Sequence, residues 1–512
     1  MTLGRTRAVA LHGLAGRMVE VEAHIAPGLP HIAVSGLPDK ACGQAPDRIR
    51  SAAAISGAPI PSHRIVVNLS PAEIPKQGSG FDLPIAVAIL VAARTIRAGV
   101  AAEAMHVAEL GLDGRLRGVR GVLPMVLAAA RAGVRDVVVA PENVAEAQLV
   151  DGVRVHAPQT LAELIGWYAA CELGAPLPVA DVVPSQTPRS AGHGDLADVV
   201  GQAQARLSLE LAATGGHHLA LSGPPGIGKT MLSERLVTIL PRLTRDEALE
   251  SHAIRSLVGL VPEGGGLDRT PPFEAPHHSS TVTAIAGGGS ATVVPGAISR
   301  AHGGVLFLDE APEFRPSVLQ TLRQPLESGH VTIGRARETV TYPARFLLVL
   351  ASNPCPCGNG HGNGIDCTCT SLEFRRYQGR LSGPLLDRID IRLSVSPVPR
   401  GAFAEERGES SAVVLARVGE AREVQRQRWS RAGHELNGRV PGSVLRRPPF
   451  RLPPEVTRAV DRCIDLGVIS LRGYDRILRL AWTAADLAGH AVPTAGDVDF
   501  ALALRETGAQ AA

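Results

Sequence analysis

One eight-residue segment has the composition and spacing of a phosphate-binding loop. Residues 223–230 follow a short apolar run at 219–221. Glycines let the backbone approach a triphosphate closely, and the helix expected after the loop favours the anion through its dipole. Lys229 can then reach the β- and γ-phosphates, while the Thr230 hydroxyl can coordinate Mg²⁺. The segment predicts a site for ATP and Mg²⁺ formed by Gly223, Pro224, Pro225, Gly226, Ile227, Gly228, Lys229 and Thr230.

Hydrolysis of the triphosphate requires acidic and polar groups on neighbouring strands. The apolar run at 305–308 is typical of a buried strand and ends in Asp309 and Glu310. We expect Asp309 to lie near Mg²⁺ and Glu310 to polarise the attacking water. Another apolar run, at 346–351, leads to Asn353, which could orient water against the γ-phosphate or could only turn the chain before a proline.

The three strands, each followed by polar residues, resemble the ATPase core of AAA+ proteins. Residues 385–390 resemble the segment that carries the arginine finger in the magnesium-chelatase and MCM-helicase branch, which implies that Arg388 completes the site of an adjacent subunit. Arg472 lies at the start of an expected helix, and this position resembles that of the second sensor residue in the lid domains of that branch. The resemblance therefore implies catalytic roles for Glu310, Asn353, Arg388 and Arg472.

A long insertion between Lys229 and Asp309 indicates which branch of the AAA+ proteins the chain resembles. It holds the pair His277-His278 and a glycine-rich stretch at 287–290. Such an insertion marks the helix-2-insert branch, and nearly the whole chain resembles the ComM/YifB group of magnesium-chelatase-like proteins. The two histidines lack a third metal ligand nearby in the sequence, so we interpret them as loop residues.

The start of the chain resembles a Lon-protease-type domain. A Ser-Lys dyad needs a nucleophile and an amine of lowered pKa side by side. The aligned serine position falls at about Gly80 or Phe81 and the lysine position at Leu123, whereas Ser79 and Lys76 are out of register. We therefore expect a structural or partner-binding domain and no peptidase activity.

The expected fold class is α/β, with a three-layer P-loop AAA+ core between an N-terminal Lon-protease-like α/β domain and a C-terminal helical lid. Several domains are expected for 512 residues. The predicted boundaries are a Lon-protease-like domain without catalytic dyad at 1–170, a linker at 171–194, the AAA+ core with its insert and Cys-rich loop at 195–397, and the lid at 398–512. Thr494 is the expected N-cap of the last helix, with an aspartate in its first turn.

Four of the seven cysteines form two C-x-C pairs, Cys355 with Cys357 and Cys367 with Cys369. Seven cysteines are too few and too unevenly spaced for a secreted disulfide scaffold. Four thiolates could bind Zn²⁺ tetrahedrally and cross-link the loop that follows Asn353. Because C-x-C is tighter than the usual two-residue spacing, a redox-sensitive thiol cluster and reduced, unligated cysteines are alternatives.

Two segments are candidates for nucleic-acid contacts, since a net charge of only +3 leaves any such contact to local patches. Residues 329–341 alternate like a hairpin, and Arg335 and Arg337 would follow phosphates if it faces a central pore, as the resemblance implies. The alternative is a solvated hairpin tip. Residues 422–447 hold seven arginines and Trp429, which fits either phosphate contacts with base stacking or an exposed, salt-bridged helix.

These features indicate an ATP-hydrolysing ring motor. The resemblance implies a homo-oligomer, a hexamer, that acts as a DNA helicase and branch-migration factor when incoming single strands recombine with the chromosome in natural transformation. The alternative is a protein-remodelling or magnesium-chelatase-like ATPase. We expect a cytoplasmic protein without membrane contact, because no signal sequence is evident and the longest apolar run, 83–93, is too short to span a bilayer and reads as a buried helix.

Overall fold

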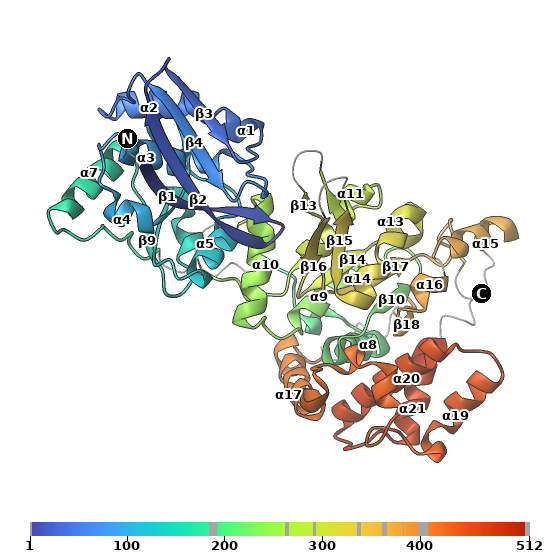
Figure 1. Cartoon of the computed structure of the whole chain (residues 1–512). Coiled ribbons are helices and arrows are strands. Elements are labelled where there is room, and N and C mark those ends of the chain that lie inside the picture. The colour runs from blue at the N-terminus through green and yellow to red at the C-terminus, as the bar shows by residue number, and fades with distance from the viewer. Residues whose placement is uncertain are drawn as a thin grey trace.

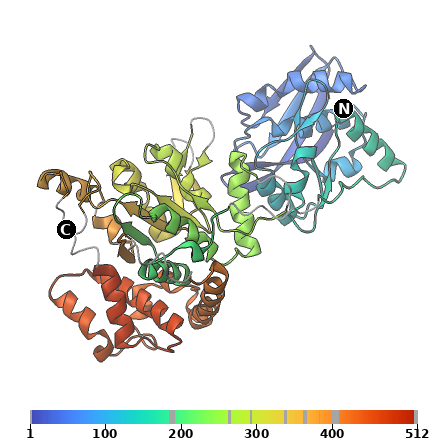
Figure 2. The same cartoon turned by 180° about the vertical axis from the view of Figure 1, so that it is seen from behind.

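The computed structural model describes residues 3–183, 192–261, 266–289, 293–334, 339–360, 366–381, 383–397 and 408–506. Figure 1 shows three lobes in chain order: a mixed α/β lobe, a central lobe around a second sheet, and a helical lobe. The view from behind in Figure 2 shows the same arrangement, with helix α10 (Arg245–Val258) lying beside the first lobe.

The N-terminal lobe is built on a seven-stranded mixed sheet with the strand order β3-β4-β2-β1-β5-β8-β9. Its strands are β1 (Leu3–His12), β2 (Ala15–Ala26), β3 (His31–Ser35), β4 (Arg64–Ser70), β5 (Met105–Val107), β8 (Asp136–Val139) and β9 (Arg154–His156), with a separate pair β6 (Glu109–Leu110) and β7 (Leu116–Arg117). Its helices are α1 (Lys40–Gly43), α2 (Ala45–Ile55), α3 (Asp82–Ala92), α4 (Ala98–Glu103), α5 (Val122–Arg131), α6 (Val144–Ala147) and α7 (Leu161–Glu172). Strands β1 and β2 form a long antiparallel hairpin, and β5, β8 and β9 extend the sheet in parallel.

Helix α3 confirms that the longest apolar run is a buried helix. All eleven of its residues are buried, because the helix lies against strands β1 and β2 and is apolar on every side. The only charged member, Asp82, is paired with Arg48 at 2.6 Å. Within the described residues, no helix is long and apolar enough to cross a membrane.

The central lobe contains a five-stranded parallel sheet with the strand order β11-β14-β17-β10-β18. Its strands are β10 (Leu219–Ser222), β11 (Phe273–Glu274), β14 (Val305–Leu308), β17 (Leu347–Ser352) and β18 (Ile391–Ser394). Its helices, besides α10, are α8 (Ala203–Gly215), α9 (Lys229–Thr238), α13 (Pro316–Thr321), α14 (Arg323–Ser328), α15 (Ser371–Arg380) and α16 (Gly383–Leu386). The three strands predicted from apolar runs are present, and this mixed α/β architecture with a parallel sheet is consistent with a P-loop AAA+-like core.

Two small hairpins project from the central lobe and pack against each other. The insert forms α11 (Val282–Ala286), β12 (Gly287–Gly288), β13 (Val294–Pro295) and α12 (Ala297–Arg300). The second hairpin consists of β15 (His330–Gly334) and β16 (Thr339–Pro343), which confirms the predicted hairpin. The Tyr342 hydroxyl donates a hydrogen bond to the Val293 carbonyl oxygen at 2.7 Å and joins the two hairpins.

The C-terminal lobe is a set of helices packed around aromatic side chains. Its helices are α17 (Ser411–Trp429), α18 (Gly442–Leu445), α19 (Pro454–Asp465), α20 (Leu471–Ala488) and α21 (Ala495–Glu506). Trp429 is fully buried and contacts Phe450 and Trp482, with ring centroids 4.5 and 5.8 Å away. The Thr494 hydroxyl accepts a hydrogen bond from the Asp497 backbone N–H at 3.3 Å, which confirms the predicted cap of the last helix.

Of the two alternatives for residues 422–447, base stacking by Trp429 is wrong, because its ring lies in this core and its indole N–H donates to Asn437 at 2.7 Å. The neighbouring arginines also bind groups within the protein. Arg428 donates to Asp486 at 3.0 Å, and Arg422 donates to the Ala213 carbonyl oxygen at 2.9 Å. Arg428 is therefore salt-bridged, as the second alternative expects, but its side chain is only 11% exposed, so that alternative is wrong about an exposed position.

Replacement of Trp429 by alanine is expected to destabilise the C-terminal lobe by about 3 to 5 kcal/mol, because it leaves a large cavity among aromatic side chains. The change should appear as a lower denaturant midpoint for this lobe in urea unfolding followed by circular dichroism. Val424→Ala is the matched control, since Val424 is 47% exposed on the same helix and its loss should shift stability by no more than about 0.5 kcal/mol.

Candidate active site

The predicted phosphate loop connects strand β10 to helix α9. Gly226 and Gly228 have φ angles of +78° and +90°, in the left-handed region that favours glycine. The loop begins beside strand β18, where a Cβ atom added to Gly223 would lie 2.5 Å from the Val395 carbonyl oxygen. Helix α9 starts at Lys229, so its first free N–H groups face the loop. The local structure is that of an anion-binding turn at a helix N-terminus.

Lys229 lies at the centre of this loop and is only 8% exposed. Its ammonium group donates to the carbonyl oxygens of Gly223 and Pro224 at 2.7 and 2.9 Å. It also donates to the side-chain oxygen of Asn353 at 3.0 Å, so the structure brings the predicted polar residue that follows β17 to the loop. Burial lowers the pKa of Lys229, whereas the nearby carboxylates of Asp309 and Glu310 act in the opposite direction.

Of the two carboxylates that follow β14, the one of Asp309 contacts the start of helix α9. The Thr230 hydroxyl donates to Asp309 Oδ2 at 3.0 Å, which places a hydroxyl and a carboxylate together as potential Mg²⁺ ligands. Glu310 has a φ angle of +51°, which is uncommon for a residue other than glycine. Its backbone N–H donates to Asp309 Oδ1 at 2.9 Å. These oxygen ligands fit Mg²⁺, and Mg²⁺ bound there would neutralise phosphate charge beside Glu310.

One contact at this site was not predicted from the sequence. The Nδ1 atom of His278 lies 3.1 Å from Oε2 of Glu310, with side-chain exposures of 36% and 51%. His278 belongs to the segment after β11, which sequence reasoning treated as a loop. No local pattern identifies this pair, because the two residues follow different strands, β11 and β14, and lie far apart in the sequence.

Arg388 and Arg472 line the same hollow, which is separate from the phosphate loop. Both line a hollow of about 830 Å³ between the central and C-terminal lobes, and no residue of the loop lines it. Arg388 is 8% exposed and forms an ion pair with Glu327. The structure therefore divides the predicted residues into a nucleotide group and an arginine group.

Asp390 connects this arginine side of the central lobe to the helical lobe. It accepts hydrogen bonds from Arg476 at 2.7 Å and from the His218 backbone N–H at 3.0 Å. Burial raises the pKa of Asp390, but Arg476 and His217 outweigh that effect and hold the pKa well below its ordinary value. Sequence reasoning missed this contact, although Asp390 lies two residues after Arg388.

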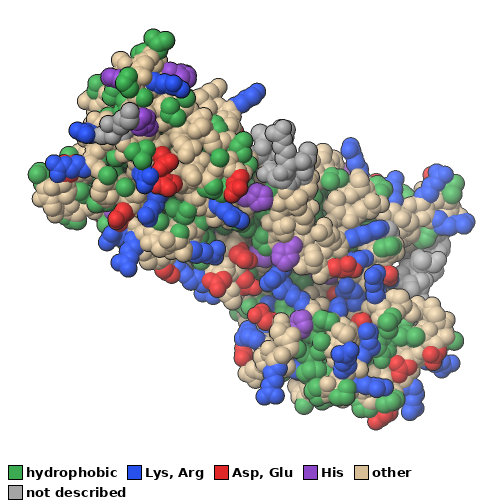
Figure 3. Space-filling view, in the orientation of Figure 1, with side chains coloured by type: hydrophobic (Ala, Val, Ile, Leu, Met, Phe, Trp, Pro, Cys, Tyr) green, Lys and Arg blue, Asp and Glu red, His purple; other side chains and the backbone are tan. Residues whose placement is uncertain are grey.

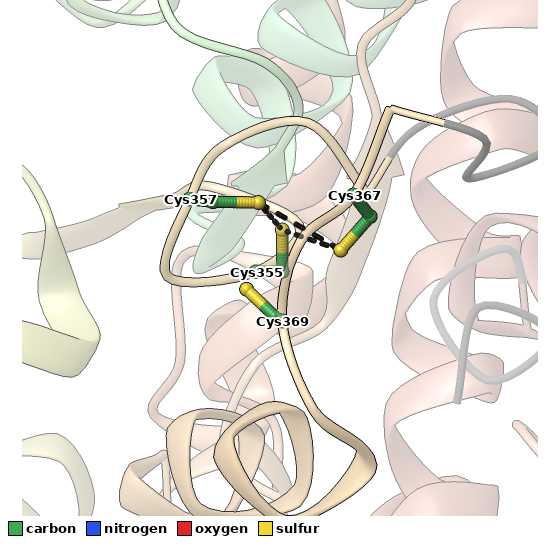
Figure 4. Close-up of side chains that lie close together, drawn as sticks. All are labelled: Cys355, Cys357, Cys367 and Cys369. Atoms are coloured by element: carbon green, nitrogen blue, oxygen red, sulfur yellow. Dashed lines mark hydrogen bonds between the residues drawn. The ribbon is translucent and has the colours of Figure 1, made fainter.

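The four clustered cysteines converge on one point, as Figure 4 shows. Their sulfur atoms all lie within 4.8 Å of one another, and the pairs of Cys355 with Cys357 and with Cys367 are 3.3 and 3.6 Å apart. Hydrogen bonding from the Asn359 backbone N–H, together with the thiol of Cys355, lowers the pKa of Cys357 to about 5. A set of four sulfur donors of this kind suits a soft tetrahedral cation.

The same loop touches the phosphate loop. A Cβ atom added to Gly358, whose φ angle is +82°, would lie 2.9 Å from the ring of Pro225. The turn between the two cysteine pairs therefore packs directly on the segment that would hold a triphosphate.

The remaining predicted residues fall elsewhere. Arg335 and Arg337, which lie between β15 and β16 in the sequence, are outside the described residues. In the N-terminal lobe, the Ser79 hydroxyl donates to Glu109, whereas the fully buried ammonium group of Lys76 donates to the Pro71 carbonyl oxygen. Ser79 and Lys76 thus bond to different partners.

Known families match three parts of the chain. The family described as magnesium chelatase, subunit ChlI, matches residues 195–403. Subunit ChlI of Mg-chelatase matches residues 21–143, and the subunit ChlI C-terminal family matches residues 408–505.

Curated relatives match nearly the whole chain. An uncharacterized protein of Mycobacterium tuberculosis is 48% identical over 511 residues, 100% of both chains. The uncharacterized protein YifB of Salmonella typhimurium is 42% identical over 493 residues, 95% of this chain and 94% of the relative. Competence protein ComM of Haemophilus influenzae is 40% identical over 494 residues, 96% of this chain and 94% of the relative. The chain therefore belongs to the ComM/YifB-type family of magnesium-chelatase-like proteins, whose core is of the AAA+ ATPase type.

Proposed function

We propose that this protein hydrolyses ATP with Mg²⁺. The observation that carries the proposal is the convergence of Lys229, Thr230, Asp309, Glu310 and Asn353 at one edge of the parallel sheet. Lys229 would exchange its carbonyl partners for phosphate oxygens, and Thr230 and Asp309 would hold Mg²⁺. Glu310 would take a proton from the attacking water, and Asn353 would orient that water.

The positions of Arg388 and Arg472 support assembly of several subunits into a ring. Because Arg388 and Arg472 line a hollow that contains no phosphate-loop residue, we infer that they act on the nucleotide of a neighbouring subunit. A site that is completed only by a second copy requires a homo-oligomer, and we propose a hexamer, as the family resemblance implies. In this assignment the C-terminal helices form the lid, and the Lon-protease-like domain binds a partner or has a structural role without cutting peptide bonds.

The proposed substrate is DNA, single-stranded or branched. One relative is named a competence protein, which fits a cytoplasmic helicase that migrates branches during recombination of incoming DNA. The β15–β16 hairpin supports this assignment, because it leads to Arg335 and Arg337, which would follow phosphates. The match to magnesium chelatase favours a second candidate, a chelatase-like or protein-remodelling ATPase.

We also propose that Cys355, Cys357, Cys367 and Cys369 bind one Zn²⁺. The convergence of four sulfur atoms within 4.8 Å supports this assignment. Bound Zn²⁺ would cross-link the loop that follows Asn353.

The first test concerns hydrolysis in the assembled protein. Arg388→Ala is expected to lower ATP turnover by about a thousandfold or more while leaving ATP affinity nearly unchanged, because the arginine acts in the transition state. Lys229→Ala should instead weaken ATP binding by about ten- to a hundredfold, since a charge-assisted phosphate contact is lost. Glu310→Gln should accumulate ATP-bound rings. Arg376→Ala, on the exposed side of α15, is the control, and full turnover of Arg388→Ala as a monomer would contradict the ring.

The second test concerns DNA. Removing both Arg335 and Arg337 should lower the slope of log affinity against log salt by roughly 1 to 2 per engaged subunit, because fewer counterions are released. DNA-stimulated ATPase and strand displacement should fall together, while basal ATPase survives. The control variant, Arg50→Ala with Arg64→Ala, removes two exposed arginines from the N-terminal lobe. If no form of DNA binds the wild type near physiological salt or stimulates its ATPase, the helicase assignment is wrong.

The third test concerns the cysteine cluster. Elemental analysis of protein purified with reductant and without chelator is expected to find about one Zn²⁺ per chain. Cys355→Ser should remove the metal and lower the melting temperature, because a structural zinc site contributes folding free energy. Cys171→Ser, outside the cluster, should change neither. Metal-free wild-type protein would identify the four residues as free thiols.

A further inference from the structure

The middle of the phosphate loop has few bonds that would persist once ATP binds. Its start is fixed, because the Gly223 N–H donates to the Ser352 carbonyl oxygen at 3.1 Å, and its end is fixed by helix α9. Between them, Pro224 and Pro225 have no backbone N–H to donate. Lys229 now binds the carbonyl oxygens of Gly223 and Pro224, but it would leave them for phosphate. The position of the outer turn then depends on packing.

That packing comes from the cysteine loop, the segment at 354–369 that carries the four clustered cysteines. Gly358 of this loop is buried, and a Cβ atom added to it would lie 2.9 and 3.0 Å from two ring carbons of Pro225. A Cβ atom added to Gly226 would meet no atom within 4 Å. The phosphate loop is therefore supported at Pro225 and open at the residue that follows it.

The cysteine loop is fixed at its two ends by helix α15. The Pro354 carbonyl oxygen accepts the Gln378 side-chain N–H at 2.9 Å, and the Thr370 hydroxyl caps the start of α15. The described residues between these ends, 354–360 and 366–369, contain no helix or strand. Their four sulfur atoms lie within 4.8 Å of one another (Figure 4). A tetrahedral cation would thus join the turn that touches the phosphate loop to the chain that enters α15.

We propose that the cysteine loop, closed by Zn²⁺, is a positioning element of the nucleotide site that holds the phosphate loop in its ATP-binding shape through the contact of Gly358 with Pro225. The inference rests on the proposed zinc site and ATPase and deepens both, because it links metal occupancy to affinity for ATP. Without the metal the loop samples other positions. If it stays competent about one tenth of the time, the apparent Kd for ATP rises about tenfold.

The first experiment measures the Kd for a fluorescent ATP analogue, with Mg²⁺, on full-length wild-type protein. Zinc-loaded protein is compared with protein stripped by phenanthroline, a chelator that prefers Zn²⁺ to Mg²⁺, and circular dichroism verifies that both are folded. The stripped protein should bind the analogue about tenfold more weakly, and added Zn²⁺ should restore the affinity.

The second experiment uses the reciprocity of the coupling and needs no stripped protein. If Zn²⁺ tightens ATP binding about tenfold, ATP must tighten Zn²⁺ binding by the same factor. Equilibrium competition with a zinc chelator, with and without a nonhydrolysable ATP analogue and excess Mg²⁺, measures that factor. Lys229→Ala, which binds nucleotide poorly, corrects for Zn²⁺ that is held by free nucleotide.

The third experiment changes the contact and keeps all four cysteines. Gly358→Ala places a Cβ atom against the Pro225 ring and should weaken ATP binding about tenfold with the zinc content unchanged. Pro225→Ala removes the obstructing ring, so the double variant should bind ATP as Pro225→Ala alone does. Gly379→Ala is the matched control, because a Cβ atom at that position of α15 meets no atom within 4 Å, and it should change neither quantity.

Two results overturn the inference while zinc and ATP still bind. One is a Zn²⁺ affinity that does not respond to the nucleotide, together with an unchanged Kd for ATP in Gly358→Ala. The other is a weakened Gly358→Ala that Pro225→Ala does not correct, since the effect then does not pass through this contact. If stripped protein unfolds, the second and third experiments decide, because both use metal-loaded protein.

Failure of the proposed function is distinguishable from these results. Wild-type protein without zinc removes the proposed zinc site together with this inference. Wild-type protein that binds zinc but no ATP contradicts the proposed ATPase as well. Zinc and ATP that bind independently remove this inference alone.

Discussion

The parallel register of the central sheet determines where the side chains of the nucleotide site can lie. Strand β10 pairs Leu221 with Ala351, and β14 pairs Leu308 with Leu350, so the segments that follow these strands leave the sheet at one edge. Thr230 and Asp309 are separated by 79 positions in the sequence, yet their side chains form a hydrogen bond. The two residues are not neighbours along the chain. The pairing of the strands brings their side chains together, and no ligand is needed for this.

The same sheet separates the two parts of the proposed machinery. The nucleotide group follows β10, β14 and β17, whereas Arg388 precedes β18 and lines the hollow next to the helical lobe. Asp390 fixes that side, because its buried carboxylate is satisfied by groups from both lobes. Removal of one partner would leave an uncompensated buried charge, so the orientation of the helical lobe is coupled to the segment that carries Arg388.

The sequence identified features whose structure is local or follows from strand order. The glycines of the phosphate loop, the carboxylates after an apolar strand and the Thr494 cap are of this kind, since each depends on a few neighbouring residues. The two alternatives for the segment around Trp429 could not be separated from the sequence, because an arginine-rich composition does not reveal which side of a helix is buried. The pairs of His278 with Glu310 and of Arg388 with Glu327 join distant segments, and no periodicity encodes them.

The backbone and the side chain of Glu310 are constrained very differently. Its N–H is bonded to Asp309, its carbonyl oxygen accepts the Glu313 N–H at 2.7 Å, and Ala311 beside it is fully buried. These contacts hold a left-handed conformation that costs roughly 1 to 3 kcal/mol and fix the point from which the side chain starts. The carboxylate itself is half exposed and contacts His278. Because these contacts fix the backbone, the Cβ atom of Glu310 has a set position, and the direction of the carboxylate depends on the side-chain torsions alone.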